Sequence, residues 1–307
     1  MFSRNLLRRF VKDFSLPIQL VQEPYFEYYL RLYDRIFETE KLFRLLVETV
    51  NKCGRKEQFF QTANRMQEEI IEAVSRTAKY QEFSNDRLER FSVPEGMEKG
   101  SIYIPENDGK YFASFDLKKA NYNALKFYHP DIVLGTRNYD EFIGRFTELE
   151  YFKKAKHLRQ VIFGNLNPKK QAKIQKYLIG QLLEPIGVHL PKEKIKATTH
   201  DEIVVELEHP DEYFCNADLK EAVERKKAEL GIELNTDVFL LRQLKPFPYY
   251  VKEHYCRAKV EFKAVPSIFM PQVVKHYFGE EIEEYDLLFY HEGQIAKFVT
   301  AISFEKQ

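Results

Sequence analysis

The chain has few cysteines, glycines and prolines, and it has no long apolar run. Its three cysteines, Cys53, Cys215 and Cys256, are far apart and odd in number. This excludes a disulfide framework and a C-x-x-C metal site, and it favours a reducing compartment. No apolar run reaches about 18 residues, so we expect no membrane span. We therefore expect a cytoplasmic protein.

Net charge indicates no partner, because 47 basic side chains balance 47 acidic ones. The local distribution is more informative. Residues 151–200 hold 11 Lys and Arg but only two acids, Glu184 and Glu193. Such a stretch is typical of an anionic partner or of a solvated helix face, and this feature alone favours the solvated face.

Hydrophobic periodicity predicts an α+β protein in three parts. Apolar spacing of three and four residues predicts two long antiparallel helices within residues 1–92. Residues 92–101 are the clearest candidate for a linker. A small antiparallel sheet backed by helices is expected in 101–210, beginning with a hairpin that turns at 107–109. Residues 211–307 are expected to add a further α+β region.

Two acidic positions stand at predicted strand ends. Asp116 follows the strand "YFASF" and precedes a helix, and "KATTHDEIVVEL" predicts a hairpin with Asp201 and Glu202 at its tip. If these strands are neighbours, the carboxylates of Asp116 and Asp201 face each other and need a cation between them, for which Mg²⁺ or Mn²⁺ is suited. Taken singly, however, Asp116 is better explained as a helix cap and Asp201 as a turn residue.

The order and context of these acids resemble the palm of family A DNA polymerases. "ASFDLKKANYNAL" is similar to motif A of that family, and "TTHDEIVVEL" is similar to its His-Asp-Glu hairpin, motif C. The resemblance covers about residues 101–207. It implies a nucleotidyltransferase that uses two metal ions, with Asp116 and Asp201 as metal ligands, Glu202 near the primer end, and His200 supporting the hairpin or touching the primer. The implied partners are a nucleotide triphosphate and DNA or RNA.

The segment between the two motifs resembles the basic fingers helices of the family. "KHLRQVIFGNLNPKKQAKIQ" contains an Arg-x-x-x-Phe-Gly pattern, which implies contacts with phosphates of the triphosphate or of the strand. The residues concerned are Arg159, Gln160, Lys169, Lys170 and Gln171. A phosphate-binding groove here predicts that neutralising Lys169 and Lys170 weakens nucleic-acid binding and its salt dependence.

The sequence also departs from the family pattern. Asn121 stands where the family has the Glu that helps to choose the sugar, so the choice between deoxynucleotides and ribonucleotides stays open. Only 85 residues separate Asp116 from Asp201, too few for a full fingers domain. These departures indicate a reduced, divergent palm, as in a phage or another mobile element.

Two other interpretations remain open. The adjacent His200 and Asp201 would also suit an HD-type metal phosphohydrolase, although that class carries the pair on a helix and here a hairpin is predicted. The chain could instead be a non-catalytic protein that binds nucleic acid. The aromatic and basic residues of 242–265 are compatible with single-stranded nucleic acid and equally with ordinary strands.

Overall fold

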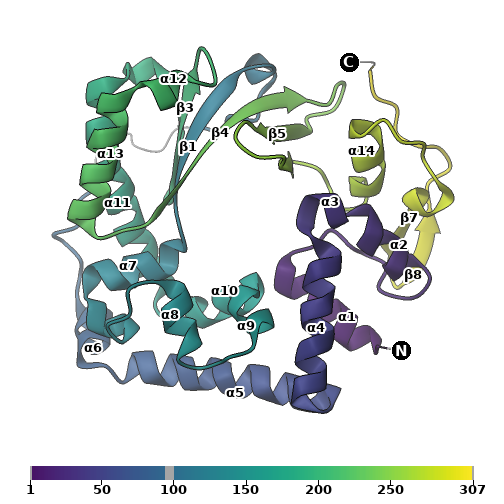
Figure 1. The fold of residues 1–307 in the computed structure, drawn as a ribbon, viewed down its shortest axis with the longest axis horizontal. Coiled ribbons are helices and arrows are strands. Elements are labelled where there is room, and N and C mark those ends of the chain that lie inside the picture. Colours follow the sequence, from purple (N-terminus) through teal and green to yellow (C-terminus); the bar gives the residue numbers. More distant parts are fainter. Residues whose placement is uncertain (1, 94–99, 306–307) are drawn as a thin grey trace.

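The computed structural model describes residues 2–93 and 100–305, and it confirms the α+β class, with N-terminal helices preceding an antiparallel sheet (Figure 1). Six strands form the main sheet in the order β2-β3-β1-β4-β5-β6. Their bounds are β1 (Tyr111–Leu117), β2 (Ile195–Thr198), β3 (Glu202–Leu207), β4 (Leu234–Gln243), β5 (Tyr250–His254) and β6 (Val260–Lys263). Because β1 lies between β3 and β4, the sheet crosses the boundary expected at residue 210.

The two faces of the sheet differ because successive side chains of a strand point to opposite sides. Ala113 and Phe115 of β1 lie in the main hydrophobic core together with Val205 of β3. Helices cover this face: α7 (Ala120–Tyr128), α11 (Pro168–His189), α12 (Glu212–Cys215) and α13 (Ala217–Leu230). The opposite face carries Ser114 and Asp116, so the polar residues of β1 are turned away from the helices.

The segment before β1 does not form the predicted hairpin. Residues 101–104 contain no strand, and a 3-10 helix (Pro105–Asn107) follows them. Both edges of β1 are already paired, with β3 on one side and β4 on the other. Ile102 and Tyr103 pack onto the face of the sheet instead. The alternating pattern that predicted a strand therefore reflects packing on the sheet.

The first predicted long helix is broken into three. These are α2 (Tyr25–Leu32), α3 (Asp34–Phe37) and α4 (Thr39–Cys53). Glu38 adopts a left-handed conformation with φ of 52°, and the Thr39 hydroxyl donates to the Leu30 carbonyl, so the chain turns before α4 begins. The second long helix is present as α5 (Lys56–Ser75). Of the expected linker, residues 94–99 lie outside the described residues.

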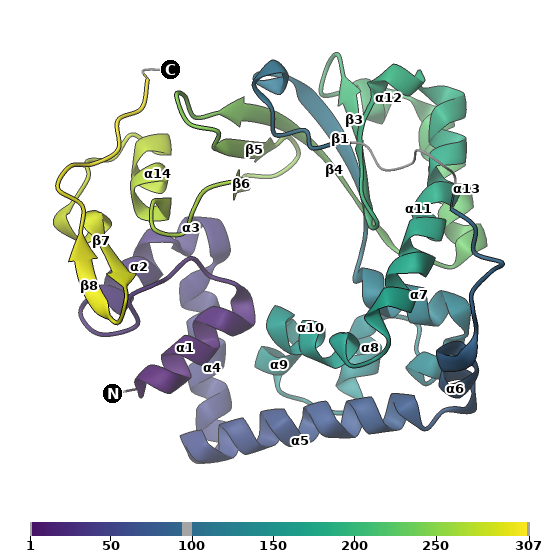
Figure 2. The ribbon, with the colours of Figure 1, turned by 180° about the vertical axis from the view of Figure 1, so that it is seen from behind.

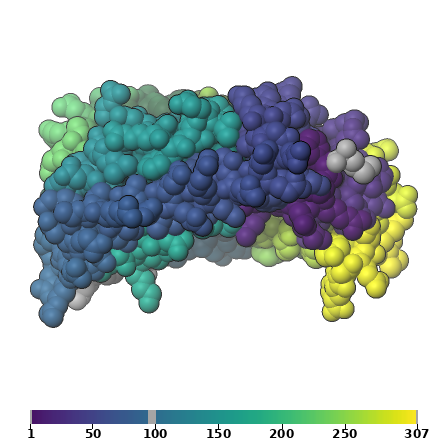
Figure 3. Space-filling model, turned by 90° about the horizontal axis from the view of Figure 1, so that it is seen from below, coloured from purple at the N-terminus to yellow at the C-terminus, as the bar shows by residue number. Residues whose placement is uncertain are grey.

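The helices and the sheet are arranged around the site described below. In both ribbon views α5 lies on the side of the molecule opposite the sheet, and α8 to α10 lie between α5 and the sheet (Figures 1 and 2). Seen from below, α4 and α5 cover this side, with the C-terminal segment at one end (Figure 3). The remaining helices are α1 (Arg4–Phe14), α6 (Ala78–Asn85), α8 (Tyr139–Gly144), α9 (Glu150–Lys154), α10 (Lys156–Gly164) and α14 (Met270–Tyr277). Further 3-10 helices are Pro130–Val133, Lys192–Lys194 and Glu284–Leu287.

The C-terminal segment contacts the N-terminal helices. It ends in the predicted hairpin, β7 (Leu288–His291) and β8 (Gln294–Lys297). The Tyr28 hydroxyl of α2 donates to Asp286 Oδ1 at 2.8 Å, and the Tyr29 hydroxyl donates to the Tyr285 carbonyl at 2.6 Å. The main hydrophobic core contains residues of all three expected regions, including Phe10. The three regions therefore share one core.

Candidate active site

Asp116, Asp201 and Glu202 meet at one end of the sheet. The predicted hairpin is present as β2 and β3, with residues 199–201 at its tip. β1 pairs with β3 so that Asp116 lies directly opposite Glu202, and the Leu117 amide donates to the Asp201 carbonyl at 2.8 Å. The His200-Asp201 pair consequently lies in a hairpin and not on the helix that an HD-type phosphohydrolase requires.

The Asp116 carboxyl is partly buried and surrounded by negative charge. Its pKa is raised to about 6, chiefly by burial and in addition by the nearby charges of Asp201 and Glu202. The Asn235 amide opposes this effect by donating to Asp116 Oδ2 at 3.2 Å. Burial disfavours the charged form of the carboxyl, and neighbouring carboxylates act in the same direction.

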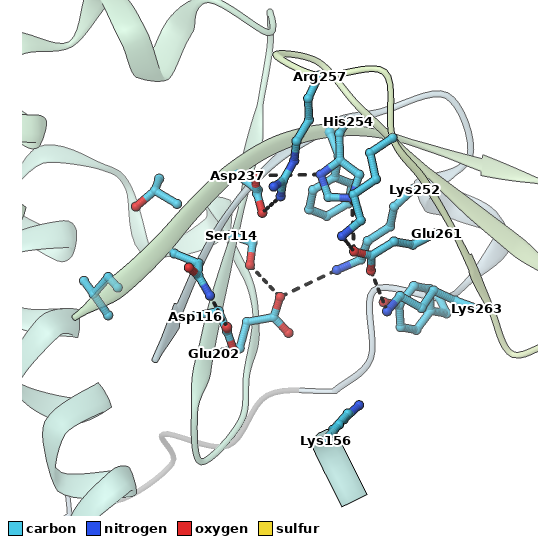
Figure 4. Close-up of a pocket in the computed structure, with 16 residues that line it drawn as sticks. Ser114, Asp116, Lys156, Glu202, Asp237, Lys252, His254, Arg257, Glu261 and Lys263 are labelled. Carbon is cyan, nitrogen blue, oxygen red and sulfur yellow. Dashed lines mark hydrogen bonds and ion pairs between the residues drawn. The ribbon is translucent and has the colours of Figure 1, made fainter. Parts of the chain in front are cut away.

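Glu202 points onto the open face of the sheet. The Ser114 hydroxyl donates to Glu202 Oε1 at 2.5 Å, and the Lys252 ammonium lies 3.6 Å from the same oxygen (Figure 4). Only 8% of the Lys252 side chain is exposed, and its nitrogen lies 4.4 Å from the centroid of the Phe239 ring. Lys252 thus places a buried positive charge beside the acids, a feature that the sequence interpretation did not identify.

Asp201 is held within its own turn. Its Oδ1 accepts a hydrogen bond from the Thr199 hydroxyl at 2.9 Å, and the Thr199 oxygen accepts from the Glu202 amide at 3.0 Å. His200 Nε2 lies 3.7 Å from Asp201 Oδ2, and half of the His200 side chain is exposed. Asp201 is close enough to raise the pKa of Asp116, yet these contacts are also those of an ordinary turn residue.

The acids open into a cavity of about 710 Å³ on the face of the sheet that lacks covering helices. Asp116 and Glu202 line it, whereas Asp201 is not among its lining residues. Positive side chains also line it: Lys156, Lys252, Arg257, Lys259 and Lys263. Lys252 is paired with Glu202, and the other cations of the sheet are paired with Asp237 or Glu261. Lys156 belongs to α10 and faces the sheet across the cavity (Figure 4). The cavity therefore joins a carboxylate cluster to a cationic wall, which suits a ligand that carries phosphates.

A second charged cluster lines the same cavity two strands away. The His254 side chain is 4% exposed and lies between Asp237 and Glu261, with Nε2 3.3 Å from Glu261 Oε1. These two carboxylates raise the pKa of His254. His254, followed by the ammonium groups of Lys259 and Lys263, holds the pKa of Glu261 well below its usual range. Alternation along "YVKEH" and "VEFK" could have placed His254 and Glu261 on one face of the sheet. The sequence did not show which face is open.

Four of the other residues expected to bind substrate are not among the residues that line this cavity. Asn121 Oδ1 accepts a hydrogen bond from Gln175 Nε2 at 2.7 Å. Gln160 and Lys169 are exposed. The Arg159 guanidinium lies 5.6 Å from the Tyr139 ring centroid, and burial lowers its pKa.

Lys170 and Gln171 have structural roles, which corrects the expectation that they bind phosphates. Gln171 is fully buried, and its Nε2 donates to the carbonyls of Phe163 and Leu166. The Lys170 ammonium donates to three carbonyls around the end of α6, at 3.1, 2.6 and 2.6 Å. Helix ends leave carbonyls without intrahelical partners, and Lys170 satisfies them.

We expect Lys170→Met to destabilise the protein by about 1.5–3 kcal/mol, because it removes charged hydrogen bonds to carbonyls. The matched variant Lys169→Met changes an exposed neighbour and should alter stability by no more than about 0.5 kcal/mol. Urea denaturation of the two variants beside the wild type measures the difference. Equal stability of both variants would show that the Lys170 contacts contribute little.

The carboxylates at this end of the sheet could hold a cation only together with water or phosphate oxygens. In residues 2–93 and 100–305, no group of three or more His, Cys, Asp or Glu side chains forms a metal-holding cluster. Mg²⁺ is commonly bound by one or two carboxylates with several waters and substrate phosphates. Asp116 and Glu202 lie opposite each other in the register and both line the cavity, so two carboxylates are available there.

Comparison with protein-family models, curated proteins and solved structures finds no match for this chain. No helix in the described part is both long and apolar enough to cross a membrane. The site must therefore be interpreted from its own geometry and from the motif resemblance.

Proposed function

We propose that the protein is a small nucleotidyltransferase that transfers nucleotides at the end of the sheet where Asp116 meets the β2–β3 hairpin. The observation that carries the proposal is the register of β1 and β3, which sets Asp116 opposite Glu202 and beside Asp201. Helices cover one face of the sheet, and the acids lie on the other, at a cavity lined by Lys and Arg side chains. The similarity of the two motifs to a family A palm supports the same conclusion.

The residues of the chain would divide the work as follows. Asp116 and Asp201, with Glu202 beside them, would hold Mg²⁺ or Mn²⁺, which supplies charge neutralisation for phosphoryl transfer. Lys252 keeps Glu202 in place from the protein side, and Lys156 faces the cavity from α10. Phosphoryl transfer depends mainly on positioning and on charge stabilisation, so a compact site of this kind suffices. DNA or RNA is the proposed acceptor strand, in a cytoplasmic setting.

A primer-extension assay tests the proposal directly. Each dNTP and each rNTP is offered separately, first with Mg²⁺ and then with Mn²⁺, to the wild type and to Asp116→Asn. We expect extension by the wild type and none by the variant. Binding of primer without extension under any condition would favour the alternative, a non-catalytic nucleic-acid-binding protein.

A further inference from the structure

Two positively charged side chains, one at the start of α7 and one in α10, have no acidic partner within ion-pair distance in the described part of the chain. Lys119 follows Asp116 by three residues and is half-buried in a left-handed turn before α7. Arg159 of α10 is likewise half-buried. Within residues 2–93 and 100–305, no carboxylate lies within 4.0 Å of either cation, whereas the neighbouring Lys118 is paired with Glu233 at 2.8 Å. A partly buried cation without a partner is unfavourable, and here two lie close together.

Both cations lie against one tyrosine. The Lys119 nitrogen is 5.5 Å and the Arg159 guanidinium 5.6 Å from the Tyr139 ring centroid. Helices α8 and α10, which carry Tyr139 and Arg159, are neighbours beside α7 in both ribbon views (Figures 1 and 2). Tyr139 itself is only 3% exposed, and burial raises the pKa of its hydroxyl, whereas the Arg159 guanidinium beside the hydroxyl lowers that pKa. Within the described residues, no acceptor lies at hydrogen-bond distance of the hydroxyl. A buried hydroxyl normally has a partner, so this one calls for an acceptor.

A small pocket adjoins these groups. It has a volume of about 60 Å³ and is lined by Lys119, Tyr139 and Asn123, together with the charged side chains of Lys118, Asp140 and Glu233. Arg159 is not among its lining residues and adjoins it through the Tyr139 ring. One water molecule needs about 10–15 Å³ of such a pocket, so this one has room for roughly four or five heavy atoms. Asn123 Oδ1 also lacks a partner and accepts hydrogen bonds, which fits an ordered water or the hydroxyl of a hydrogen phosphate. Two carboxylates also line the pocket, but Glu233 is paired with Lys118, and Asp140 lies beyond ion-pair distance of Lys119, so the charge of Lys119 is offset only in part.

We propose that Lys119, Arg159 and the Tyr139 hydroxyl bind one phosphate-class oxyanion between the start of α7 and the start of α8. The anion accepts hydrogen bonds from the tyrosine and neutralises both cations, which explains why neither has a carboxylate partner. Because the pocket is small, it can hold a terminal phosphate group but not a continuous strand. Its identity as a phosphate of a nucleotide rests on the proposed function, but the binding of an oxyanion does not.

Proton linkage gives the site a distinctive signature. Burial, and next the charge of Arg159, lower the pKa of Lys119 to about 8, while Asp140 and Glu233 raise it and Lys118 lowers it slightly. A bound anion favours the protonated ammonium, so binding near pH 8 takes up a proton and weakens as the pH rises above 8.

Isothermal titration calorimetry on the full chain, in EDTA, tests the site without any catalytic step. The probes are tripolyphosphate, inorganic phosphate, and an oligonucleotide without a terminal phosphate. We expect tripolyphosphate to bind best, with proton uptake visible as a dependence on the ionisation enthalpy of the buffer at pH 8. Lys119→Met should weaken binding by about 10–100-fold and abolish the proton uptake, because it removes a charge-assisted contact. Lys126→Met, which removes a lysine bound to the Arg137 carbonyl, is the matched control and should bind as the wild type does.

Lys119→Arg, which keeps the charge, should restore binding but not the proton uptake near pH 8, and melting curves show whether each variant is folded. Equal binding by the wild type and a folded Lys119→Met, or no binding of tripolyphosphate at millimolar concentration, overturns the proposal and leaves a structural cation–π cluster. Better binding of the oligonucleotide overturns the assignment to a terminal phosphate. Tripolyphosphate binding without primer extension would keep this inference and reject the proposed function.

Discussion

Asp116→Asn should raise the melting temperature of the metal-free protein at pH 7–8 and abolish nucleotide transfer. The pKa of Asp116 is raised from 3.8 to about 6, so the folded state favours the protonated carboxyl. Stability from this group is fully present below pH 3.8 and is lost as the pH rises through about 6, leaving a charged, partly buried carboxylate at neutral pH. Each pKa unit corresponds to about 1.4 kcal/mol, and after allowance for partial exposure the penalty is about 1–2 kcal/mol.

The neutral amide removes this penalty and can still accept the hydrogen bond from Asn235. Thermal denaturation at pH 4 and pH 8, with and without Mn²⁺, checks the argument. We expect the variant to melt higher than the wild type at pH 8 and at about the same temperature at pH 4. Mn²⁺ should stabilise the wild type alone. A variant that melts lower than the wild type at pH 8 would show that the Asp116 charge is compensated within the protein.

Much of the sheet could be predicted because its strands have strong local signals. The hairpin around Asp201 follows from alternation and from β-branched residues, and the hairpin around Gly293 has a turn in which Glu292 and Gly293 both adopt positive φ. The strand before Asp116 and its neighbour β3 were expected from the sequence, whereas the hairpin with residues 101–106 was wrong and the pairing with β4 was not predicted. Pairing of β1 with β4 joins residues more than 100 positions apart, and local pattern carries no information about such a contact.

The acidic part of the candidate site could be located from the sequence, whereas its cationic part could not. Asp116 and Glu202 occupy strand ends with recognisable context. Lys252 and His254 become part of the site only because β4 and β5 add to the edge of β1, which the sequence did not reveal. Lys170 belongs to a basic segment of the kind that contacts phosphates, yet its ammonium binds carbonyls at the end of α6. The function of a lysine therefore depends on tertiary neighbours more than on its local pattern.

The second large effect is expected at the hairpin tip, where either Asp201 or Glu202 could be the second metal ligand beside Asp116. Asp201→Asn should lower nucleotide transfer on the order of 10²–10³-fold or more, because it removes a charge that the cation needs beside Asp116. It should also lower the pKa of Asp116, since the Asp201 charge helps to raise it. Glu202→Gln should cost only about 10–100-fold, as for a group that supports a ligand, and the amide oxygen can still accept from Ser114.

Both variants keep the shape of the side chain, so the fold should persist, and melting curves establish this. Single-turnover extension assays over a Mn²⁺ titration separate loss of metal affinity from loss of rate. Ser114→Ala is the matched control for Glu202, because it removes the hydroxyl that donates to Glu202 and leaves all three carboxylates in place. Glu202 lines the cavity and faces Asp116 in the register, so a greater loss in Glu202→Gln than in Asp201→Asn would reassign the second metal ligand to Glu202. The Thr199 and Asp201 contacts would then be those of a turn that holds Glu202 in place.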